Sequence, residues 1–322
     1  MDPLVDIIIT CYNSERYIDK TLASVFAQTY KNIHIICVND GSNDNTLSKL
    51  EEFRKMHANL TIVDKMNGGI EFALKEGIKN LKGEYVFVLD HDDTISNDAI
   101  EKSVLAFQND PELDAVRVDL VFTNEKDEVL RALDDRRKLN GIDALAETLR
   151  SWNIHTLCLW RRDIFSQLND VTTNGQSDFN ELGTRYLYSL CRYVGFCDGK
   201  YYYFQNQQSI GKKFSIKRFV LHTNYMLQKV FEKNIKITPE IMSLIKKYRF
   251  QSMLALRILY SANRDKLTKS ERQDINSQFK FHYKDIDKKS LKHLSPTKRK
   301  LLLTNFSLFS LTAFVFTKIK KM

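Results

Sequence analysis

Residues 83–93 read Gly83-Glu84-Tyr85-Val86-Phe87-Val88-Leu89-Asp90-His91-Asp92-Asp93. The part from Tyr85 to Leu89 is apolar and rich in β-forming residues, which predicts a strand buried on both faces of a parallel sheet. Three carboxylates follow within four residues, and because like charges repel one another they need a cation nearby to be stable together. Hard oxygen ligands of this kind favour Mg²⁺ or Mn²⁺. The alternative is a polar turn in which Asp93 or Ser96 caps the next helix.

The composition is that of a folded protein with reduced thiols. The chain has 322 residues, of which 43% are hydrophobic, enough for one large domain or for one domain with an appendage. Its five cysteines are scattered and form no Cys-x-x-Cys pair, so we expect free thiols rather than disulfides or a zinc site. A strand-like run begins at Val5 without a basic segment or a cleavage site before it, so we expect a cytoplasmic protein.

Charge is distributed unevenly along the chain. Residues 1–200 hold 23 Lys and Arg against 33 Asp and Glu, a net charge of −10, whereas residues 201–322 hold 26 against 7, a net charge of +19. Such a contrast indicates a basic module that meets an anionic surface, either membrane lipid or nucleic acid. The lysines are not interleaved with aromatic residues in a known binding motif, so we expect no nucleic-acid partner.

Strand and helix patterns alternate through the first hundred residues. Strands are predicted over residues 6–13, 33–38 and 60–63, and helices over 14–28, 46–56 and 70–81. This order predicts an α/β fold with a doubly wound, mostly parallel sheet. Polar and glycine-rich turns follow the strands, where a nucleotide would lie in such a sheet.

Two of these turns carry candidate binding residues. Asp40 could accept a hydrogen bond from a nucleobase, or it could belong to a tight turn before a helix. The turn Asn67-Gly68-Gly69 could let backbone N–H groups approach a phosphate, or it could be a plain loop. It is neither a P-loop nor a dinucleotide fingerprint, because the Gly-Lys-Ser/Thr and Gly-x-Gly-x-x-Gly patterns are both absent.

Four blocks of sequence occur together in one order. They are Ile7-Ile8-Ile9-Thr10-Cys11-Tyr12-Asn13-Ser14-Glu15-Arg16-Tyr17-Ile18, then Ser24-Val25-Phe26-Ala27-Gln28-Thr29-Tyr30, then Val38-Asn39-Asp40-Gly41-Ser42-Asn43-Asp44-Asn45-Thr46, then Asn67-Gly68-Gly69 through Gly83-Glu84-Tyr85 to Asp90-His91-Asp92-Asp93. With these blocks, residues 5 to about 100 resemble the donor-binding half of family 2 glycosyltransferases, which have the GT-A fold. The resemblance implies an inverting transferase that takes sugar from a nucleotide-sugar, usually a UDP-sugar.

The resemblance also implies roles for individual residues. Thr10, Tyr12 and Asp40 would hold the nucleobase, and the full implied donor site is Thr10, Tyr12, Glu15, Asp40, Asn67, Gly68, Asp90 and His91. Of the two motif carboxylates, Asp92 would bind Mn²⁺ or Mg²⁺ directly at the donor diphosphate, and Asp90 would lie nearer the ribose and the ion's water shell. Many members carry Arg-Asn where this chain has Leu74-Lys75, which leaves the donor sugar open but not the donor class.

An inverting transfer needs a base that takes the proton from the acceptor hydroxyl. The family places this base in a Glu-Asp pair at the start of a helix, and Ser177-Asp178 stands there, before a helix expected over 185–194 and a Tyr-rich strand over 201–206. We therefore expect Asp178 to be the base, with Glu181 as the reserve candidate. Alternatively, Asp178 caps the helix and Glu181 completes a capping box.

The segment over residues 152–165 resembles the part of the family that leads to the acceptor pocket. Trp152, His155 and Trp160 could stack on an acceptor sugar and hydrogen-bond to it. Each tryptophan could equally lie inside a core strand, and a structural role is the better expectation for His155.

From residue 211 onward the sequence predicts helices and no convincing strand. Residues 216–231 and 238–260 show helical periodicity with many lysines, and residues 270–290 are a lysine-rich, weakly helical stretch. Residues 301–316 are mostly apolar and flanked by lysines, but they are shorter than the roughly 20 residues of a membrane-spanning helix. We expect this segment to lie in a membrane interface, where basic clusters favour anionic lipid; the alternative is a helix buried in a protein contact.

These features predict a GT-A domain at residues 1–210, with a donor half at about 1–100 and an acceptor half at about 101–210, followed by a basic helical region at 211–322. The expected function is metal-dependent transfer of a hexosyl or N-acetylhexosaminyl group to a glycan, carried on lipid, in bacterial capsule, O-antigen or similar polysaccharide synthesis. The expected location is the cytoplasm, peripheral on the inner face of the cell membrane. The alternative is an inactive nucleotide-sugar-binding scaffold in a glycan-assembly complex. The sequence leaves the sugar, the linkage and the oligomeric state open.

Overall fold

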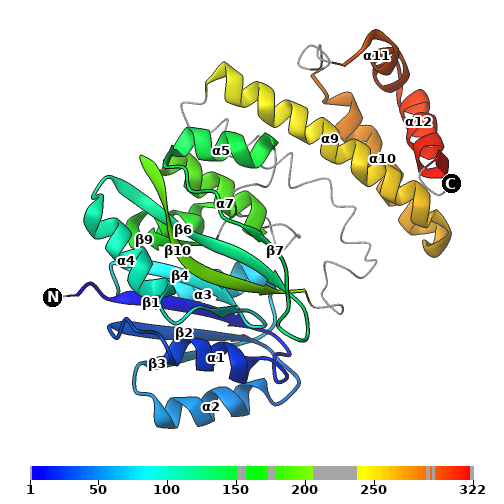
Figure 1. Ribbon diagram of the computed structural model, residues 1–322. Coiled ribbons are helices and arrows are strands. Elements are labelled where there is room, and N and C mark those ends of the chain that lie inside the picture. The colour runs from blue at the N-terminus through cyan, green and yellow to red at the C-terminus, as the bar shows by residue number, and fades with distance from the viewer. Residues whose placement is uncertain are drawn as a thin grey trace. The chain divides into compact units, whose positions relative to one another are not determined.

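The computed structural model describes residues 2–150, 155, 157–172, 179–205, 238–287, 291 and 294–319 (Figure 1). The chain divides into two compact units, Met1–Gly175 with Phe179–Lys212, and Gln176–Asp178 with Lys213–Met322. The predicted domain boundary at residue 210 falls outside the described residues and stays a prediction, as does the division into donor and acceptor halves.

Four parallel strands form the first part of the sheet in the larger unit (Figure 1). They lie in the order β3 (Leu60–Lys65), β2 (Ile33–Asp40), β1 (Val5–Cys11) and β4 (Tyr85–Asp90). The connecting helices are α1 (Ile18–Phe26), α2 (Thr46–Met56) and α3 (Ile70–Lys79). The register sets Thr10 of β1 beside Asp90 of β4, and β2 ends with Asn39 and Asp40 next to the end of β1, so polar residues from three neighbouring strands meet at one edge of the sheet.

The second part of the sheet mixes both strand directions. β9 (Cys158–Arg161) lies antiparallel between β4 and β6 (Leu113–Thr123), and β10 (Tyr193–Phe204) runs parallel to β6. Three short strands pair antiparallel at the margins: β5 (Thr94–Ile95) and β8 (Leu139–Asn140) on β10, and β7 (Val129–Leu133) on β6. The predicted mixed α/β fold with a mostly parallel sheet is confirmed.

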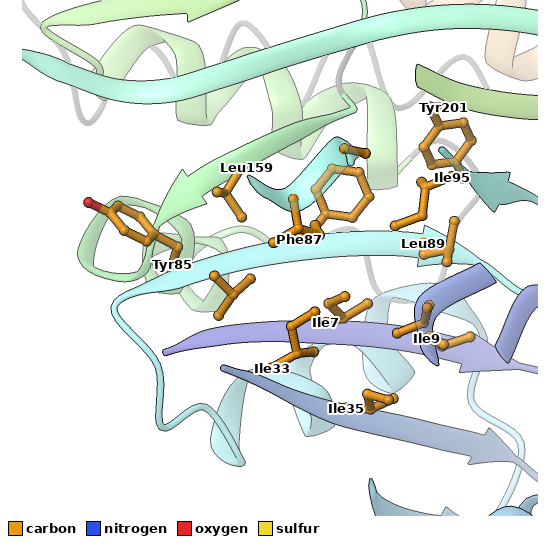
Figure 2. Close-up of a cluster of buried hydrophobic side chains, with 14 of the residues drawn as sticks. Ile7, Ile9, Ile33, Ile35, Tyr85, Phe87, Leu89, Ile95, Leu159 and Tyr201 are labelled. Atoms are coloured by element: carbon orange, nitrogen blue, oxygen red, sulfur yellow. The ribbon is translucent and has the colours of Figure 1, made fainter. Parts of the chain in front are cut away.

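Both faces of the sheet are covered by helices, as a doubly wound fold requires. On one face Ile7 and Phe87 share a buried cluster with Leu22 of α1 and with Val104 of α4 (Ala99–Asn109). Figure 2 shows side chains of this cluster, contributed by β1, β2, β4, β5, β9 and β10. Ile8 points to the opposite face, where it lies against α3 at Gly77. Burial on both faces explains why the strands read as continuous apolar runs.

Some predicted element boundaries are wrong. The helix expected over 185–194 is α7 (Phe179–Leu190), whose buried stripe begins at Phe179, and Val194 belongs to β10. The helix expected over 14–28 begins only at Ile18, because residues 14–17 form a hydrogen-bonded loop. The helices α5 (Gly141–Arg150) and α6 (Arg162–Phe165) were not predicted from the sequence.

The smaller unit is helical in its described part. It contains α9 (Pro239–Asn263), α10 (Lys269–Lys284), α11 (Pro296–Leu303) and α12 (Phe306–Ile319). The helix predicted over 238–260 corresponds to α9, which Thr238 caps through its side chain, and a Thr268–Glu271 capping box starts α10. The buried Arg257 guanidinium lies 4.6 Å from the ring centroid of Tyr260, and it hydrogen-bonds to Asn276. The helix expected over 216–231 lies outside the described residues.

The segment over residues 301–316 is divided between two helices rather than forming one. α11 ends at Leu303, and α12 begins at Phe306 after a break at Thr304 and Asn305. Leu302, Leu303 and Phe309 are buried in the core of the helical unit, as the alternative of a packed helix predicted. Leu301 and Leu311 remain exposed. Within the described residues, every helix is too short or too polar to cross a membrane.

Candidate active site

Hydrogen bonds join the loop that follows β1 to the loop that follows β2, and we call these two the locked loops. The backbone N–H of Ser14 donates to Thr46 Oγ1 at 2.7 Å, and that of Asn13 donates to Ser42 Oγ at 3.0 Å. In return, the N–H of Asn45 donates to Glu15 Oε2 at 2.9 Å. Glu15, which the resemblance placed near the nucleobase, therefore joins the two loops. Tyr12, in the loop directly after β1, is exposed.

Asp40 holds the glycine turn that follows β3. Its carboxylate accepts hydrogen bonds from the N–H groups of Gly68 at 2.9 Å and Gly69 at 2.8 Å, and from Lys65 Nζ at 2.5 Å. The side chain of Asn67 donates to the Asp40 carbonyl at 2.9 Å. These amides thus fix the turn against Asp40. Asp40 is buried, and within the described residues these three donors occupy three of the roughly four acceptor positions of its carboxylate.

Gly41 allows this close approach of the β2 end to the turn. Its φ is +67°, a conformation that residues with a side chain rarely adopt. A Cβ at this position would lie 2.5 Å from the backbone nitrogen of Asn67. Gly69 also has a positive φ, +88°, but a Cβ there would meet no atom within 4 Å.

The three carboxylates after β4 have different surroundings. Asp93 is buried and accepts hydrogen bonds from the Tyr201 hydroxyl and the Phe204 N–H, both at 2.7 Å. The same Tyr201 hydroxyl accepts a hydrogen bond from the Asp90 N–H at 3.1 Å. Asp93 therefore anchors the end of β4 to β10, and Asp90 and Asp92 remain for a ligand.

Burial and mutual repulsion act on this cluster. Burial raises the pKa of Asp90, and the charge of Asp92 raises it further. Burial also raises the pKa of Asp93 well above its ordinary value, with added contributions from Asp90 and Asp92. Oxygen ligands under mutual repulsion are the donor set that suits a hard divalent cation, so Asp90 and Asp92 fit one chemically. In the described part of the chain, no three His, Cys, Asp or Glu side chains are grouped so as to hold a metal.

Thr10 and His91 connect β1 to the carboxylate strand. His91 Nδ1 lies 3.1 Å from the Thr10 carbonyl oxygen, and the His91 carbonyl accepts a hydrogen bond from Thr21 at 2.8 Å. Thr10 is buried, whereas His91 is half-buried. The implied donor residues Thr10, Asp90 and His91 are therefore brought together.

A cavity of about 80 Å³ lies beside Asp90, on the α3 side of the sheet. It is lined mainly by apolar side chains such as Leu74 and Leu187, with Asn180 and Thr184 from the start of α7. Lys75, at the position where the family differs, donates to Glu71 at 3.1 Å and to Thr172 at 3.2 Å. It also lies 5.8 Å from the Phe179 ring centroid, so it is held near the start of α7.

Of the two candidates for the catalytic base, Glu181 and Asp178, only Glu181 lies among the described residues. Glu181 lies in the first turn of α7 and forms an ion pair with the buried Arg185. Its carboxylate is therefore engaged in holding that arginine, which also bonds to Thr148. Asp178 lies outside the described residues, as does its expected capping of the helix.

Of the three acceptor candidates, two have a described position. Trp160 lies in core strand β9, only 2% exposed, with its ring 5.4 Å from that of Tyr188, although it also lines the cavity beside Asp90. His155 is buried and accepts a hydrogen bond from the Leu157 N–H at 3.2 Å. These positions favour the structural alternative for both side chains. Trp152 lies outside the described residues.

Burial should keep His155 neutral far below its ordinary pKa. Burial, helped by the charge of Arg117, lowers the pKa of His155 from 6.5 to about 3. Between these values the unfolded chain takes up a proton that the folded chain refuses, so the free energy of unfolding falls as the pH falls. His155→Asn, which keeps an acceptor for Leu157, should reduce this slope by up to about 1.4 kcal/mol per pH unit. Urea denaturation between pH 6.5 and 4 measures it, and equal slopes in both proteins would contradict the prediction.

Two contacts of the site were not predicted from the sequence. Lys65 bonds to Asp40 because β3 extends two residues beyond the predicted strand and sets Lys65 opposite Asp40 in the register. Tyr201 bonds to Asp93 across a separation of 108 residues, for which the sequence holds no local signal.

The comparison with known families decides the class of this chain. A sequence profile described as "Glycosyl transferase family 2" matches residues 6–168, just over half of the chain. The chain belongs to glycosyl transferase family 2. The matched residues include the locked loops, the Asp40-bound turn and the carboxylates after β4.

Curated relatives of this family-2 chain match between 34% and 39% of it. An uncharacterized glycosyltransferase of Haemophilus influenzae is 38% identical over 126 residues, 39% of this chain and 39% of that protein. Glycosyltransferase GlyA of Streptococcus pneumoniae is 37% identical over 113 residues, 34% of this chain and 16% of that protein. Poly-beta-1,6-N-acetyl-D-glucosamine synthase of Staphylococcus epidermidis is 38% identical over 112 residues, 35% of this chain and 27% of that protein. The matches thus span well under half of each relative.

Solved structures confirm the GT-A fold for the family-2 chain. S. aureus TarS residues 1–349, crystallised with UDP-GlcNAc, superpose with a TM-score of 0.75 at 16% identity, covering 99% of this chain and 91% of that one. Mannosyltransferase PcManGT from Pyrobaculum calidifontis, in complex with GDP-Man and Mn²⁺, has a TM-score of 0.56 at 15% identity, covering 100% of this chain and 89% of that one. At such identities the likeness concerns the fold alone.

Proposed function

We propose that this chain transfers a sugar from a nucleotide-sugar to a glycan hydroxyl with inversion at the anomeric carbon. The observation that carries the proposal is the meeting of two groups at one edge of the sheet. The Asp40-bound turn follows β2 and β3, and Asp90 and Asp92 follow β4, with Thr10 of β1 between them. Ligands of open α/β sheets bind at this edge.

The nucleotide would lie across the end of β1. Tyr12, exposed in the loop after β1, offers a face for the base, and Asp40, within the described residues, retains an acceptor position for a ring N–H. Asn67 and Gly68 complete this wall of the site. A UDP-sugar is the first candidate, in keeping with the UDP-GlcNAc complex of the TarS structure.

Asp92 would bind Mn²⁺ or Mg²⁺ directly, with Asp90 beside it. Such an ion supplies positive charge to the departing nucleoside diphosphate. Tyr201 fixes the chain on which both carboxylates stand, because its hydroxyl bonds to the Asp90 N–H and to Asp93. Preorganised side chains of this kind need no rearrangement when charge develops.

The acceptor hydroxyl would lose its proton to Asp178. The ion pair of Glu181 with Arg185 supports this choice, because it holds the Glu181 carboxylate in a structural contact at the start of α7. A glycan on a lipid carrier is the proposed acceptor, and the basic smaller unit, with exposed Leu301 and Leu311, would meet an anionic membrane. Sedimentation with phosphatidylglycerol vesicles, but not with phosphatidylcholine vesicles, is the expected result; no sedimentation with either contradicts this part.

The test of the proposed function is a panel of nucleotide-sugars. The purified protein is incubated with UDP-, GDP- and dTDP-sugars, with and without Mn²⁺, and the nucleoside diphosphate released when water takes the sugar in place of the acceptor is measured. We expect one donor to be consumed, only with the metal present. A protein that binds a nucleotide-sugar but never releases the diphosphate would instead be the inactive scaffold.

A further inference from the structure

A second hollow lies against Asp92. It is enclosed by the start of α1, by β5, by the turn between β6 and β7, and by the end of β10, and we call it the hairpin hollow. Its volume is about 170 Å³. A cavity of roughly 150 Å³ holds a six-membered ring such as benzene. Asp92 is the only implied donor or metal residue among the described residues that line it.

The turn that closes the hairpin hollow is rigid. Asn124 Oδ1 accepts hydrogen bonds from the N–H groups of Lys126 at 2.9 Å and Glu128 at 3.1 Å. Asp127 has a φ of +59°, a left-handed conformation that aspartate tolerates better than most residues. The turn therefore presents Glu125 and Asp127 from a fixed backbone.

Two ion pairs join this turn to α1 and to the loop before it, and all four side chains line the hollow. Lys20 Nζ lies 2.5 Å from Asp127 Oδ1, and Arg16 lies 3.9 Å from Glu125. All four side chains are more than 60% exposed, so each pair contributes less than about 1 kcal/mol. Ligand hydroxyl groups could thus replace either pair at little cost.

Aromatic side chains form the inner wall. The rings of Tyr17 and Phe204 lie 5.7 Å apart, and Tyr202 and Phe204, two residues apart on β10, both line the hollow. A pyranose has a face of C–H groups and a rim of hydroxyls. Aromatic rings with planar charged side chains around them match both parts of such a ring.

Charge favours an uncharged sugar. Each of the two cations in the hollow is paired with a carboxylate, and the third carboxylate, Asp92, is the proposed metal ligand, so the lining residues leave no positive side chain over for an anion. A carboxylate- or phosphate-bearing ligand would find no unpaired cation among these described residues. A neutral pyranose needs no such cation, because its hydroxyl groups can hydrogen-bond to the paired side chains.

We propose that the hairpin hollow binds a neutral pyranose of the acceptor glycan, next to the sugar that receives the transferred group. This inference rests on the proposed function, because only a transferase with a glycan acceptor needs such a site beside the donor. Tyr202 supplies the stacking surface, and Arg16, Lys20, Glu125 and Asp127 contact the hydroxyls.

The test measures weak sugar binding directly by saturation-transfer difference NMR. The probes are the methyl glycosides of glucose, galactose and N-acetylglucosamine, with methyl glucuronide as the charged counterpart, all with UDP and the diamagnetic ion Mg²⁺ present. We expect saturation transfer to the ring protons of at least one neutral glycoside and not to methyl glucuronide. Tyr202→Ala should reduce that signal at least fivefold. Tyr193→Ala, at the far end of the same strand, should leave it unchanged.

The outcomes separate this inference from the proposed function. If UDP binds but the neutral glycosides give no signal, or give equal signals in wild type and Tyr202→Ala, the hairpin hollow is not the acceptor site. Stronger binding of methyl glucuronide than of the neutral glycosides also overturns the inference. If UDP itself does not bind, the proposed function fails. Should Tyr202→Ala not fold, the double variant Lys20→Gln with Asp127→Asn, at exposed positions, carries the same expectation.

Discussion

Replacing Asp92 with asparagine should reduce sugar transfer by roughly 10²–10³-fold or more. The change keeps the size of the side chain and removes its charge, so a divalent cation at the donor diphosphate loses its direct anionic ligand. The fold should persist, because Asp92 is half-buried and no hydrogen bond to its carboxylate occurs within the described residues. Released nucleoside diphosphate measures the activity, and thermal unfolding measures the fold.

Asp19→Asn is the matched control for this variant. It makes the same chemical change on the surface of α1, where the Asp19 side chain is 56% exposed and pairs only weakly with Lys49. Its activity should stay within about twofold of wild type, because surface changes of this kind have small effects. An Asp92→Asn protein that keeps more than a tenth of the wild-type rate would show that the carboxylate is not a metal ligand.

Gly41→Ala should destabilise the larger unit and weaken nucleotide binding. An alanine at a φ of +67° has an unfavourable backbone conformation. Its Cβ would also lie 2.5 Å from the Asn67 nitrogen, so the glycine turn must move. Together these effects should lower the free energy of unfolding by roughly 2–5 kcal/mol. Because both tryptophans belong to the larger unit, their fluorescence during urea denaturation reports on its unfolding. UDP affinity should fall at least tenfold, measured by calorimetry.

Gly69→Ala separates the cost of the backbone conformation from the cost of the clash between the new Cβ and the glycine turn. Its φ of +88° with a ψ of 172° lies in a region that is almost restricted to glycine, but no atom lies within 4 Å of its Cβ, so only this conformational cost, about 1–3 kcal/mol, should be lost. Equal losses in the two variants would mean that the packing of Gly41 against the turn does not hold the site together.

Local signals in the sequence predicted the first half of the fold well. The helix expected over 46–56 is α2, because its residues favour helix and it lies between two buried strands. The carboxylate strand was predicted because an apolar run of β-forming residues suits a strand covered on both faces. These elements depend on neighbours in the sequence, and the patterns report such neighbours directly.

Features that depend on distant partners were not predictable. β9 enters the sheet antiparallel between β4 and β6, and no local pattern announces a strand of four residues in that place. Asp93 looked like a helix cap or a metal ligand, but it is bound by Tyr201 and Phe204 from β10. The division of residues 301–316 into two helices, with Leu302 and Phe309 buried in the core of the helical unit, likewise depends on residues from other helices.

The most direct measurement of the central claim is electron paramagnetic resonance of Mn²⁺. The signal of free Mn²⁺ should fall when the wild-type protein and UDP are both present, because Asp92 and the diphosphate together hold the ion. It should fall much less with either partner alone, and Asp92→Asn should restore it. A free-ion signal that UDP does not lower in wild type beyond its effect in Asp92→Asn would contradict the claim that the carboxylates after β4 join a metal to a sugar donor.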